Sequence, residues 1–303
     1  VACDLKTKGP SDNNNFYILT DRKPKFSYEK VCPYNSYSRK NISFLELFSK
    51  GANFIFETDD DNQIYNSKIN DLTKYLDYKF EYKRYDGVQN IFSYVYSDFS
   101  DNIWARGFPI RALDSNINLN IVNNEFPSEI GVVQYLVDGN PDVDAIIRLV
   151  KSNNIQISAQ SDRLPLHLFN QFHPINSQAT LWSRNEFVLM YLPSTCTFRM
   201  TDIWRGYIAQ KILYSNKKTV VFDIPIVNQI RNEHIVSSDF FSEYNGYNES
   251  LDVINTLIDL NLDGMNYFDS MYECYYSLYK KNIFDKAELV NLDAWLNSIK
   301  EIL

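Results

Sequence analysis

The stretch that most limits the possible folds is residues 43–62, SFLELFSKGANFIFETDDDN. Its first eight residues carry apolar side chains at helical spacing, and Gly51 follows them as a usual helix C-cap. The apolar run 53–56 predicts a buried strand, and three aspartates come shortly after it. A helix, a glycine, a strand and a polar loop in this order are typical of an α/β sheet.

The rest of the chain continues this alternation to about residue 245 and then becomes helical. We therefore predict an α/β domain over residues 1–245, with a Rossmann-type mixed central sheet flanked by helices, and a helical C-terminal segment over residues 246–303. The region 187–192 is ambiguous between strand and helix. The other predicted strands are 16–20, 130–137 and 219–222, and the other predicted helices are 71–78, 202–214, 251–262, 267–280 and 286–302.

Charge and composition exclude several classes of partner. The chain carries a formal net charge of −8 and has no run rich in lysine or arginine, so we expect no nucleic-acid partner. No apolar run reaches the roughly 18 residues of a transmembrane helix, and no signal peptide is recognisable after Val1.

The four cysteines are far apart and form no CxxC pair, which favours free thiols in a reducing compartment, such as the cytoplasm, over a zinc site.

The aspartates at 59–61 follow the predicted strand closely. Ligands of open α/β sheets bind beyond the carboxyl ends of strands, so these side chains are candidate binding groups. Neighbouring carboxylates repel one another, and a hard divalent cation such as Mn²⁺ or Mg²⁺ would relieve the repulsion and could bridge the phosphates of a nucleotide-sugar. This arrangement resembles the D-x-D motif of metal-dependent GT-A glycosyltransferases. The alternative is an exposed acidic turn, which is common.

Two loop-like stretches carry further candidates. Residues 104–111, WARGFPIR, combine two arginines with glycine and proline. Arginine binds phosphate through paired hydrogen bonds and glycine lets a ligand approach the backbone, although a solvated surface turn explains the stretch as well. Residues 138–145, DGNPDVDA, have turn chemistry, and Asp142 or Asp144 could begin a helix that runs to Leu149. The alternative is that one of these carboxylates binds hydroxyls of a transferred sugar.

A third stretch, residues 197–207, contains two arginines, an aspartate and a tryptophan. Thr201 or Asp202 is a suitable helix N-cap, and Asp202 beside an aromatic side chain could also be the catalytic base for an acceptor hydroxyl. None of the three histidines belongs to an HExxH motif. His234 comes late in the predicted α/β domain, where it could complete a metal site or have a purely structural role.

Six blocks of the sequence occur in the order in which a known family has them. They are PYNSYSRKN at 33–41, ETDDDN at 57–62, ARGFPI at 105–110, GNPDVDAIIRL at 139–149, FHPINSQATLW at 172–182 and LPSTCTFRMTDIWRGYIAQ at 192–210. Together they resemble the STELLO family of glycosyltransferase-like proteins. The match runs from about residue 16 to about residue 235, and the helices predicted after residue 250 lie outside it.

The resemblance to the STELLO family implies a GT-A-like fold. In plants the family is bound to the Golgi membrane and linked to cellulose synthase assembly. Because no membrane segment is found in this chain, that context is not carried over, and a place in the Golgi lumen is expected only if a membrane tether has been removed.

A more distant similarity is to the reversibly glycosylated polypeptides, which are UDP-arabinopyranose mutases. Those proteins have an acidic triplet, then an Arg-Gly-aromatic-Pro stretch, then an Asp-x-Trp block. The corresponding residues here are 59–61, 106–109 and 202–204. The arginine of the Arg-Gly motif becomes reversibly glycosylated in the mutases, so this resemblance singles out Arg106.

The leading hypothesis is a metal-dependent glycosyltransferase that transfers a sugar from a nucleotide-sugar, a UDP-sugar by expectation, to a glycan or another hydroxyl acceptor. The alternatives are a nucleotide-sugar mutase centred on Arg106 and a non-catalytic scaffold that kept the nucleotide pocket. We expect Mn²⁺ or Mg²⁺ at Asp59, Asp61 and His234. We expect Asp21 to contact the nucleobase, Asp60 the ribose or the sugar, and Arg39 and Arg106 the phosphates. Sugar hydroxyls are expected to bind Asp142 or Asp144 and Asn176 or Gln178. Asp202 is expected to be the base for the acceptor hydroxyl if the enzyme inverts.

Overall fold

A computed structural model describes most of the chain. The strand predicted at 16–20, the helix predicted at 71–78 and the candidate site residues Asp21, Asp60 and His234 lie outside the described residues, so these predictions stay predictions. The described residues are 23–59, 61–65, 87–88, 90–96, 103–113, 129–151, 155–168, 170–230 and 235–303.

The described strands form a main mixed sheet and a small second sheet. Neighbours along the main sheet are β1 (Phe54–Thr58), β7 (Ala179–Ser183), β4 (Glu129–Gly139), β8 (Lys218–Gln229) and β2 (Asn62–Ile64), and β5 (Leu166–Leu168) also pairs with β8. In this sheet β4 and β8 are parallel, whereas the other pairs are antiparallel. The second sheet pairs β3 (Gly87–Val88) with β6 (Gln171–Phe172).

The strand directions bring several loops to one edge of the main sheet. β1, β4 and β8 run the same way, and β7 runs between β1 and β4 in the opposite direction. The carboxyl ends of the three strands and the amino end of β7 therefore lie at the same edge. Asp59 directly follows β1, residues 140–142 follow β4, and residues 176–178 precede β7. The predicted position of Asp59, just beyond a strand, is confirmed.

The central strand β4 is buried on both faces, which explains its near-continuous apolar sequence. Successive side chains of a strand point to opposite faces. Val132 and Leu136 belong to the larger core, while Val133, Tyr135 and Val137 belong to a smaller core. The strand predicted at 130–137 is therefore confirmed.

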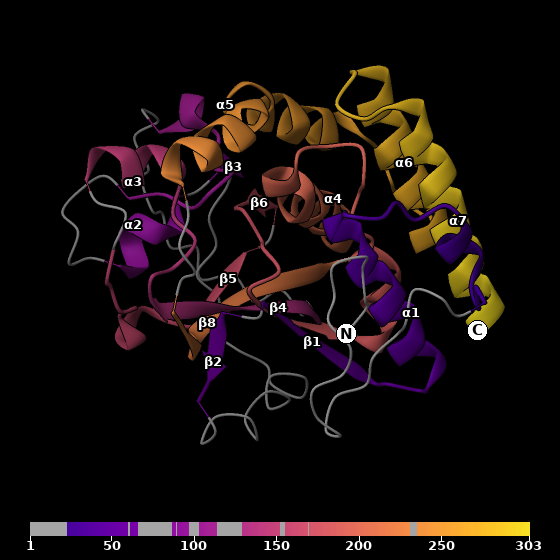
Figure 1. Cartoon of the computed structure of the whole chain (residues 1–303), viewed down its shortest axis with the longest axis horizontal. Coiled ribbons are helices and arrows are strands. Elements are labelled where there is room, and N and C mark those ends of the chain that lie inside the picture. Colours follow the sequence, from indigo (N-terminus) through magenta and orange to yellow (C-terminus); the bar gives the residue numbers. More distant parts are fainter. Residues whose placement is uncertain are drawn as a thin grey trace.

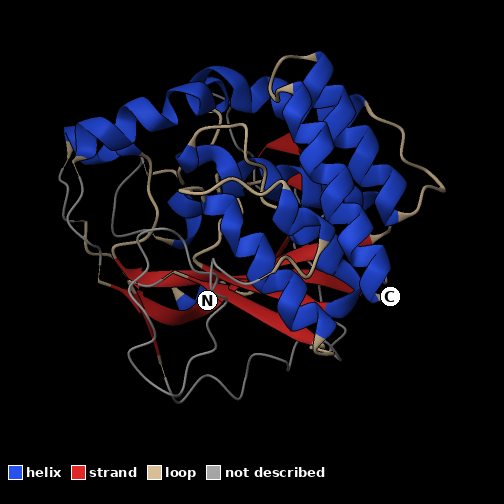
Figure 2. Ribbon diagram, turned by 45° about the vertical axis from the view of Figure 1, so that its right-hand side comes forward, coloured by secondary structure: helices blue, strands red, loops and turns tan. Residues whose placement is uncertain are grey.

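Most of the helices lie over one face of the main sheet (Figures 1 and 2). α1 spans Lys40–Ser49, and Gly51 terminates it two residues later. The φ of Gly51 is +82°, a conformation that glycine adopts without strain. The N–H groups of Gly51 and Ala52 donate to carbonyls of the last helical turn at 3.0 and 3.2 Å, which completes a Schellman motif. The predicted helix and its glycine cap are confirmed.

α4 (Thr201–Ser215) is the central helix, and almost all of its side chains are buried. It packs against β8 and against the C-terminal helices, and it confirms the helix predicted at 202–214. The ambiguous region near residue 190 is neither strand nor α-helix but the 3₁₀ helix η7 (Arg184–Met190). The other helices before the C-terminal segment are η1 (Ser27–Lys30), η2 (Tyr37–Arg39), α2 (Ile91–Val95), η5 (Ile110–Ala112), α3 (Ala145–Val150), η6 (Ser161–Arg163) and η8 (Phe198–Met200).

The C-terminal segment contains α5 (Val236–Asp259), α6 (Tyr267–Lys280) and α7 (Lys286–Ile302). α6 and α7 lie where they were predicted, but α5 begins well before residue 251. Periodicity of apolar residues could not reveal its first half, because the buried positions there are mostly polar. They are Asp239, Glu243, Gly246 and Ser250. The boundary placed at residue 245 falls inside this continuous helix, and the division into two domains stays a prediction.

The C-terminal helices pack directly on the α/β part. Trp295 of α7 is fully buried and donates through Nε1 to the carbonyl of Val188 at 2.9 Å. The predicted fold class, a mixed α/β sheet with flanking helices and a helical C-terminal segment, is confirmed. Within the described part of the chain, no helix has the length and apolar character needed to cross a membrane. Cys32, Cys196 and Cys274 are free thiols, as predicted.

Candidate functional site

Asp59, just beyond β1, is contacted by two side chains from the start of α1 and the turn before it. Its Oδ1 accepts hydrogen bonds from Lys40 Nζ at 2.8 Å and from the hydroxyl of Tyr37 at 3.0 Å. The side chains of Asp59 and Lys40 are 34% and 27% exposed. This end of the site is therefore open to solvent.

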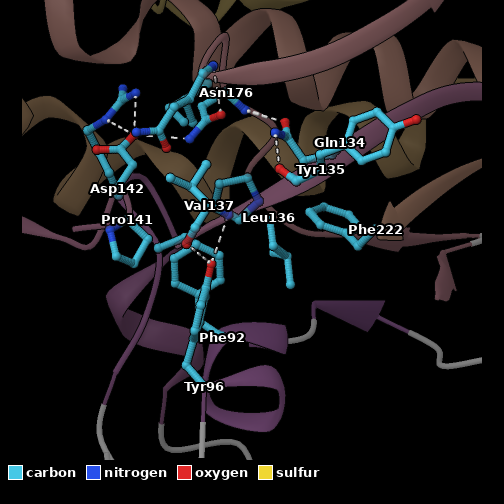
Figure 3. A pocket seen from close by; sticks show the side chains of 15 residues that line it. Phe92, Tyr96, Gln134, Tyr135, Leu136, Val137, Pro141, Asp142, Asn176 and Phe222 are labelled. Carbon is cyan, nitrogen blue, oxygen red and sulfur yellow. Dashed lines mark hydrogen bonds and ion pairs between the residues drawn. The ribbon is translucent and has the colours of Figure 1, made fainter. Parts of the chain in front are cut away.

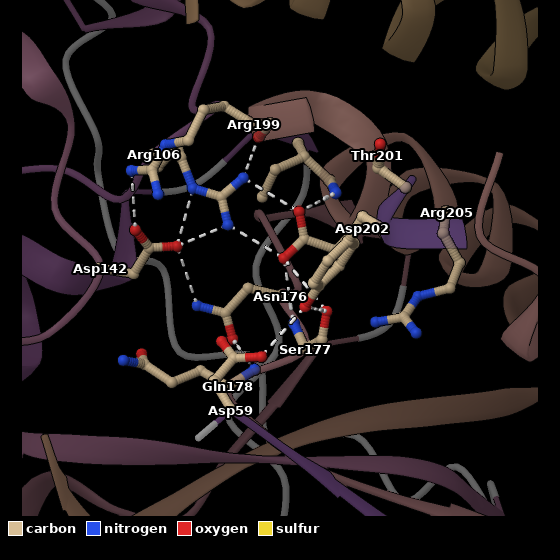
Figure 4. Close-up of polar contacts among 12 residues, drawn as sticks. Asp59, Arg106, Asp142, Asn176, Ser177, Gln178, Arg199, Thr201, Asp202 and Arg205 are labelled. Carbon is tan, nitrogen blue, oxygen red and sulfur yellow. Dashed lines mark hydrogen bonds and ion pairs between the residues drawn. The ribbon is translucent and has the colours of Figure 1, made fainter. Parts of the chain in front are cut away.

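The Tyr37 hydroxyl also connects Asp59 to the loop before β7. It lies 2.7 Å from Ser177 Oγ, and the backbone N–H and hydroxyl of Ser177 both donate to Asp202 Oδ2, at 3.1 and 3.3 Å. Asp202 lies in the first turn of α4. Figure 4 shows the loop, the helix and the end of β1 meeting through these contacts.

Arg106 lies at the centre of the buried part of the site (Figure 4). Its Nη1 and Nη2 donate to the two oxygens of Asp202, both at 2.9 Å. Its Nε and Nη2 lie 2.8 and 2.7 Å from Asp142 Oδ2, and Nη1 also donates to the carbonyl of Arg199. A guanidinium has five N–H groups, so these five contacts engage all of them.

Arg199 extends this network to the polar face of α5. Its Nε and Nη2 donate to Glu243 Oε1 at 3.0 and 2.8 Å, and its Nη2 lies 3.3 Å from Asp142 Oδ1. Glu243 Oε2 accepts the backbone N–H of Ala145 at 3.0 Å. Glu243, on the first half of α5, is therefore buried with its carboxylate bound by Arg199 and by the backbone of Ala145.

The ion pairs set the protonation of the central groups. Burial by itself would raise the pKa of Asp202, but Arg106 lowers this pKa below its usual value. Burial would lower the pKa of Arg106, whereas Asp142 and Asp202 raise it well above its usual value. Asp202 must leave this ion pair before it can act as a base. Arg106 likewise has no N–H group left for a sugar or a phosphate.

A second buried charge cluster lies under Asp59. Glu57 of β1 pairs through Oε2 with Arg205 Nη1 at 2.7 Å, and both side chains are 1% exposed. Lys40 Nζ lies 3.7 Å from the other carboxylate oxygen of Glu57. The guanidinium of Arg205 also lies over the ring of Trp182, 5.1 Å from its centroid. Lys40 thus connects the buried pair to the partly exposed Asp59.

Asp144 and Arg39, which were predicted to bind a sugar and a phosphate, contact other residues of the chain. Asp144 caps α3, because its Oδ1 accepts the backbone N–H of Ile146 at 2.9 Å. The side chain of Asp144 is fully buried, and burial together with the nearby Glu243 raises its pKa to about 7. Arg39 is 8% exposed and its guanidinium lies 4.6 Å from the ring centroid of Tyr34. The predicted roles of Asp144 and Arg39 in sugar and phosphate binding stay predictions.

Asn176 and Gln178 line a small cavity beside Arg106 and Asp142 (Figure 3). Asn176 donates to Asp142 Oδ2 at 3.3 Å and accepts the backbone N–H of Gln178 at 3.0 Å. The cavity volume is about 20 Å³, which is room for roughly one water molecule. A sugar ring does not fit in this cavity.

The groups expected to hold a metal are only partly described. Asp59 Oδ1 is engaged by a lysine and a tyrosine, and Asp61 Oδ2 accepts from Gln229 Nε2 at 2.9 Å. The other oxygen of Asp61 is buried without a hydrogen-bond partner, so it remains available to a cation. Among the described residues, no three His, Cys, Asp or Glu side chains are grouped so as to bind a metal. The expected Mn²⁺ or Mg²⁺ stays a prediction.

The two described histidines are buried. His173 lies among the rings of Phe92, Phe108 and Phe222, with centroid distances of 5.2 to 6.0 Å. His167 on β5 is 3% exposed, and burial lowers its pKa to about 4. These surroundings are those of packed core residues.

Several site residues were missed at the level of sequence. Lys40 and Tyr37 lie in the block at 33–41, Glu57 in the block at 57–62 and Arg205 in the block at 192–210, but no motif predicts a role for any of them. One signal was present: a carboxylate in the apolar strand FIFET and an arginine in the apolar stretch IWRGYIA are both expected to be buried. Buried charges need partners, so such a pair predicts a contact.

Comparisons with known proteins find similarity to the same family that the six sequence blocks resemble. A family model described as STELLO glycosyltransferases matches residues 199–303, which includes the C-terminal helices that the earlier resemblance did not cover. Two proteins of Arabidopsis thaliana, named "Probable glycosyltransferase STELLO1" and "Probable glycosyltransferase STELLO2", are each 20% identical over 94% and 93% of this chain. The chain spans only 38% and 39% of the length of these relatives.

The fold and the site define an α/β protein whose charged residues gather at the carboxyl edge of a mixed sheet. The family model and both relatives point to a single family of such proteins. The chain is similar to the STELLO glycosyltransferases in the matched residues 199–303 and, at 20% identity, along most of its length.

Proposed function

We propose that this chain binds a nucleotide-sugar beside Asp59 and transfers its sugar to a hydroxyl acceptor. The observation that carries the proposal is the unbroken path of polar contacts from Asp59 through Tyr37, Ser177 and Asp202 to Arg106. The path joins distant blocks of sequence at the edge where α/β sheets bind ligands. The names of the two Arabidopsis relatives support the same class of reaction.

Exposure favours the Asp59 end of this path as the binding surface. The side chain of Asp59 is 34% exposed, whereas those of Arg106 and Asp202 are each 6% exposed. Phe198 lies next to this end, 62% exposed and with its ring centroid 5.1 Å from that of Tyr37. An exposed aromatic ring of this kind can stack on a nucleobase or a sugar ring.

In the proposed reaction, the bond between the anomeric carbon of the donor sugar and the diphosphate oxygen breaks. The acceptor oxygen bonds to that carbon, and its proton passes to a base. Negative charge grows on the departing diphosphate, so a fixed cation beside it lowers the barrier. Lys40 is partly exposed and lies next to Asp59, which suits this role. A UDP-sugar donor and a glycan acceptor are the substrates that we propose.

Arg106 and Asp202 are assigned a positioning role in this proposal. Asp202 accepts two hydrogen bonds from Ser177, and Ser177 in turn contacts the tyrosine that binds Asp59. The buried ion pair thus fixes the loop before β7, and this loop supports the exposed end of the site. No contact of Arg106 favours the mutase alternative, because its N–H groups are all engaged.

The proposal is tested by incubating the chain with labelled UDP-sugars and a panel of glycan acceptors, followed by product analysis. We expect transfer, and Asp59→Asn should lower kcat/KM by about 100-fold, as removal of a key polar group at a reacting centre does. The matched control is Asp252→Asn, whose carboxylate is 62% exposed in a surface pair with Arg111 and should leave transfer unchanged.

Two results would contradict this function. Interconversion of sugar ring forms without an acceptor would identify a mutase instead. Nucleotide binding without any product would identify a non-catalytic scaffold.

A further inference from the structure

The ammonium of Lys40 lies in a set of oxygen atoms at the end of β1. Its Nζ is 2.8 Å from Asp59 Oδ1, 3.0 Å from the Tyr37 hydroxyl and 3.3 Å from the carbonyl of Thr58. A carboxylate oxygen of Glu57 lies slightly farther away, at 3.7 Å. Carboxylate, carbonyl and hydroxyl oxygens are also the ligands that Mg²⁺ and Mn²⁺ prefer. The lysine thus occupies oxygens that a divalent ion at Asp59 would need.

The charges of the four side chains that are linked through Lys40 and Glu57 balance one another. Two carboxylates, those of Glu57 and Asp59, are matched by two cations, Lys40 and Arg205. Glu57 and Arg205 are buried, so neither can move its charge away into solvent. A divalent ion added at Asp59 would leave this group with excess positive charge unless Lys40 moved out. The repulsion that led us to expect a metal is therefore relieved at Asp59 by side chains of the chain itself.

Lys40 is also placed where a ligand can reach it. Its side chain is 27% exposed, whereas that of Arg205 is 1% exposed. It lies at the carboxyl edge of the main sheet, the edge where ligands of α/β sheets bind. A phosphate group that approaches Asp59 from solvent would meet this ammonium.

We propose that Lys40 supplies the positive charge for the diphosphate of the donor in place of a divalent metal at Asp59. Binding of the nucleotide then does not depend on Mn²⁺ or Mg²⁺. This inference rests on the proposed function, because it concerns the same donor site. Lys40 is assigned here as a phosphate-binding residue, a role not given to it by the sequence blocks.

The test is calorimetric titration with UDP, once in EDTA and once with Mn²⁺. The wild-type affinity should agree within about twofold between the two conditions. Lys40→Met keeps the length of the side chain and removes its charge, and should weaken UDP binding in EDTA at least tenfold, about the effect of one lost charged hydrogen bond. The matched control is Lys25→Met, because Lys25 pairs with Glu46 at 3.0 Å well outside the site and should leave binding unchanged.

A second titration uses Mn²⁺ alone and needs no nucleotide. The wild type should leave Mn²⁺ unbound at Asp59, and Lys40→Met should gain a Mn²⁺ site that Asp59→Asn then removes. Circular dichroism of each variant checks that it is folded. If Lys40→Met does not fold, the comparison of EDTA with Mn²⁺ on the wild type still decides the question.

The outcomes separate this inference from the proposed function. UDP binding that requires Mn²⁺ would overturn the role of Lys40 and leave the proposed function intact. Absence of UDP binding under both conditions would remove the proposed function. In that case, Mn²⁺ bound by the wild type and lost in Asp59→Asn would also show that Lys40 does not replace a metal.

Discussion

Arg205 and Glu57 form a fully buried ion pair, with Nη1 2.7 Å from Oε2, although the residues are 148 positions apart in the sequence. The pair joins the central helix α4 to β1, the strand that leads to Asp59. It therefore links the stability of the core to the geometry of the exposed end of the site.

Removal of one partner of this pair should be strongly destabilising. Arg205→Met leaves the carboxylate of Glu57 buried with only the more distant Lys40 beside it, and we expect a loss of about 3–5 kcal/mol in the free energy of unfolding. The double variant Glu57→Gln/Arg205→Met should lose less than the single one, because no unpaired charge remains. Urea denaturation measures both. A loss below about 1 kcal/mol for the single variant would contradict the pairing.

Arg106→Lys should lower stability despite keeping the charge. A lysine has three donors on a flexible chain and cannot reproduce the paired contacts of Arg106 with Asp202 and Asp142. We expect the free energy of unfolding to fall by about 2–4 kcal/mol, measured by chemical denaturation. Arg111→Lys is the matched control, because Arg111 is 53% exposed in a surface pair and should change stability little. Equal stabilities of the two variants would argue against the buried network.

Gly206→Ala should disturb the site through packing alone. A Cβ at residue 206 would lie 2.6 Å from the backbone carbonyl of Ile175, so α4 and the loop before β7 would have to separate. We expect a loss of about 1–3 kcal/mol in stability and weaker UDP binding, because Ser177 lies in that loop. Thermal melting and calorimetry test the two effects, with Lys211→Ala on the same helix as the control. Unchanged UDP binding would show that the loop does not support the donor site.

Acidification should destabilise the protein through His167. Burial lowers its pKa to about 4, whereas an unfolded histidine titrates near 6.5. Between these values the unfolded state binds more protons, so stability is full above pH 6.5 and falls as the pH drops toward 4, by at most about 3 kcal/mol. Urea denaturation at a series of pH values should show a shallower loss in His167→Gln. Identical pH profiles would mean that this histidine does not titrate as proposed.

Local patterns were sufficient for much of the fold. The helix capped by Gly51, the strand within 129–139 and the helices α4, α6 and α7 were all recognisable, because apolar periodicity and backbone preferences act between neighbours in the chain. The same reasoning placed Asp59 just beyond a strand end. It failed for the first half of α5, where Asp239 and Glu243 occupy buried positions and apolar periodicity is absent.

The tertiary structure decided which charges meet. The sequence marked Arg106 and Asp202 as separate candidates, whereas folding pairs them and leaves neither free to act alone. It also brings Lys40 to Asp59, a contact that no motif indicated. These pairings depend on strand order, on register and on the packing of α4 against β8. Burial then fixes the pair of Arg106 and Asp202, because an ion pair removed from water cannot lose one partner without a large cost in free energy.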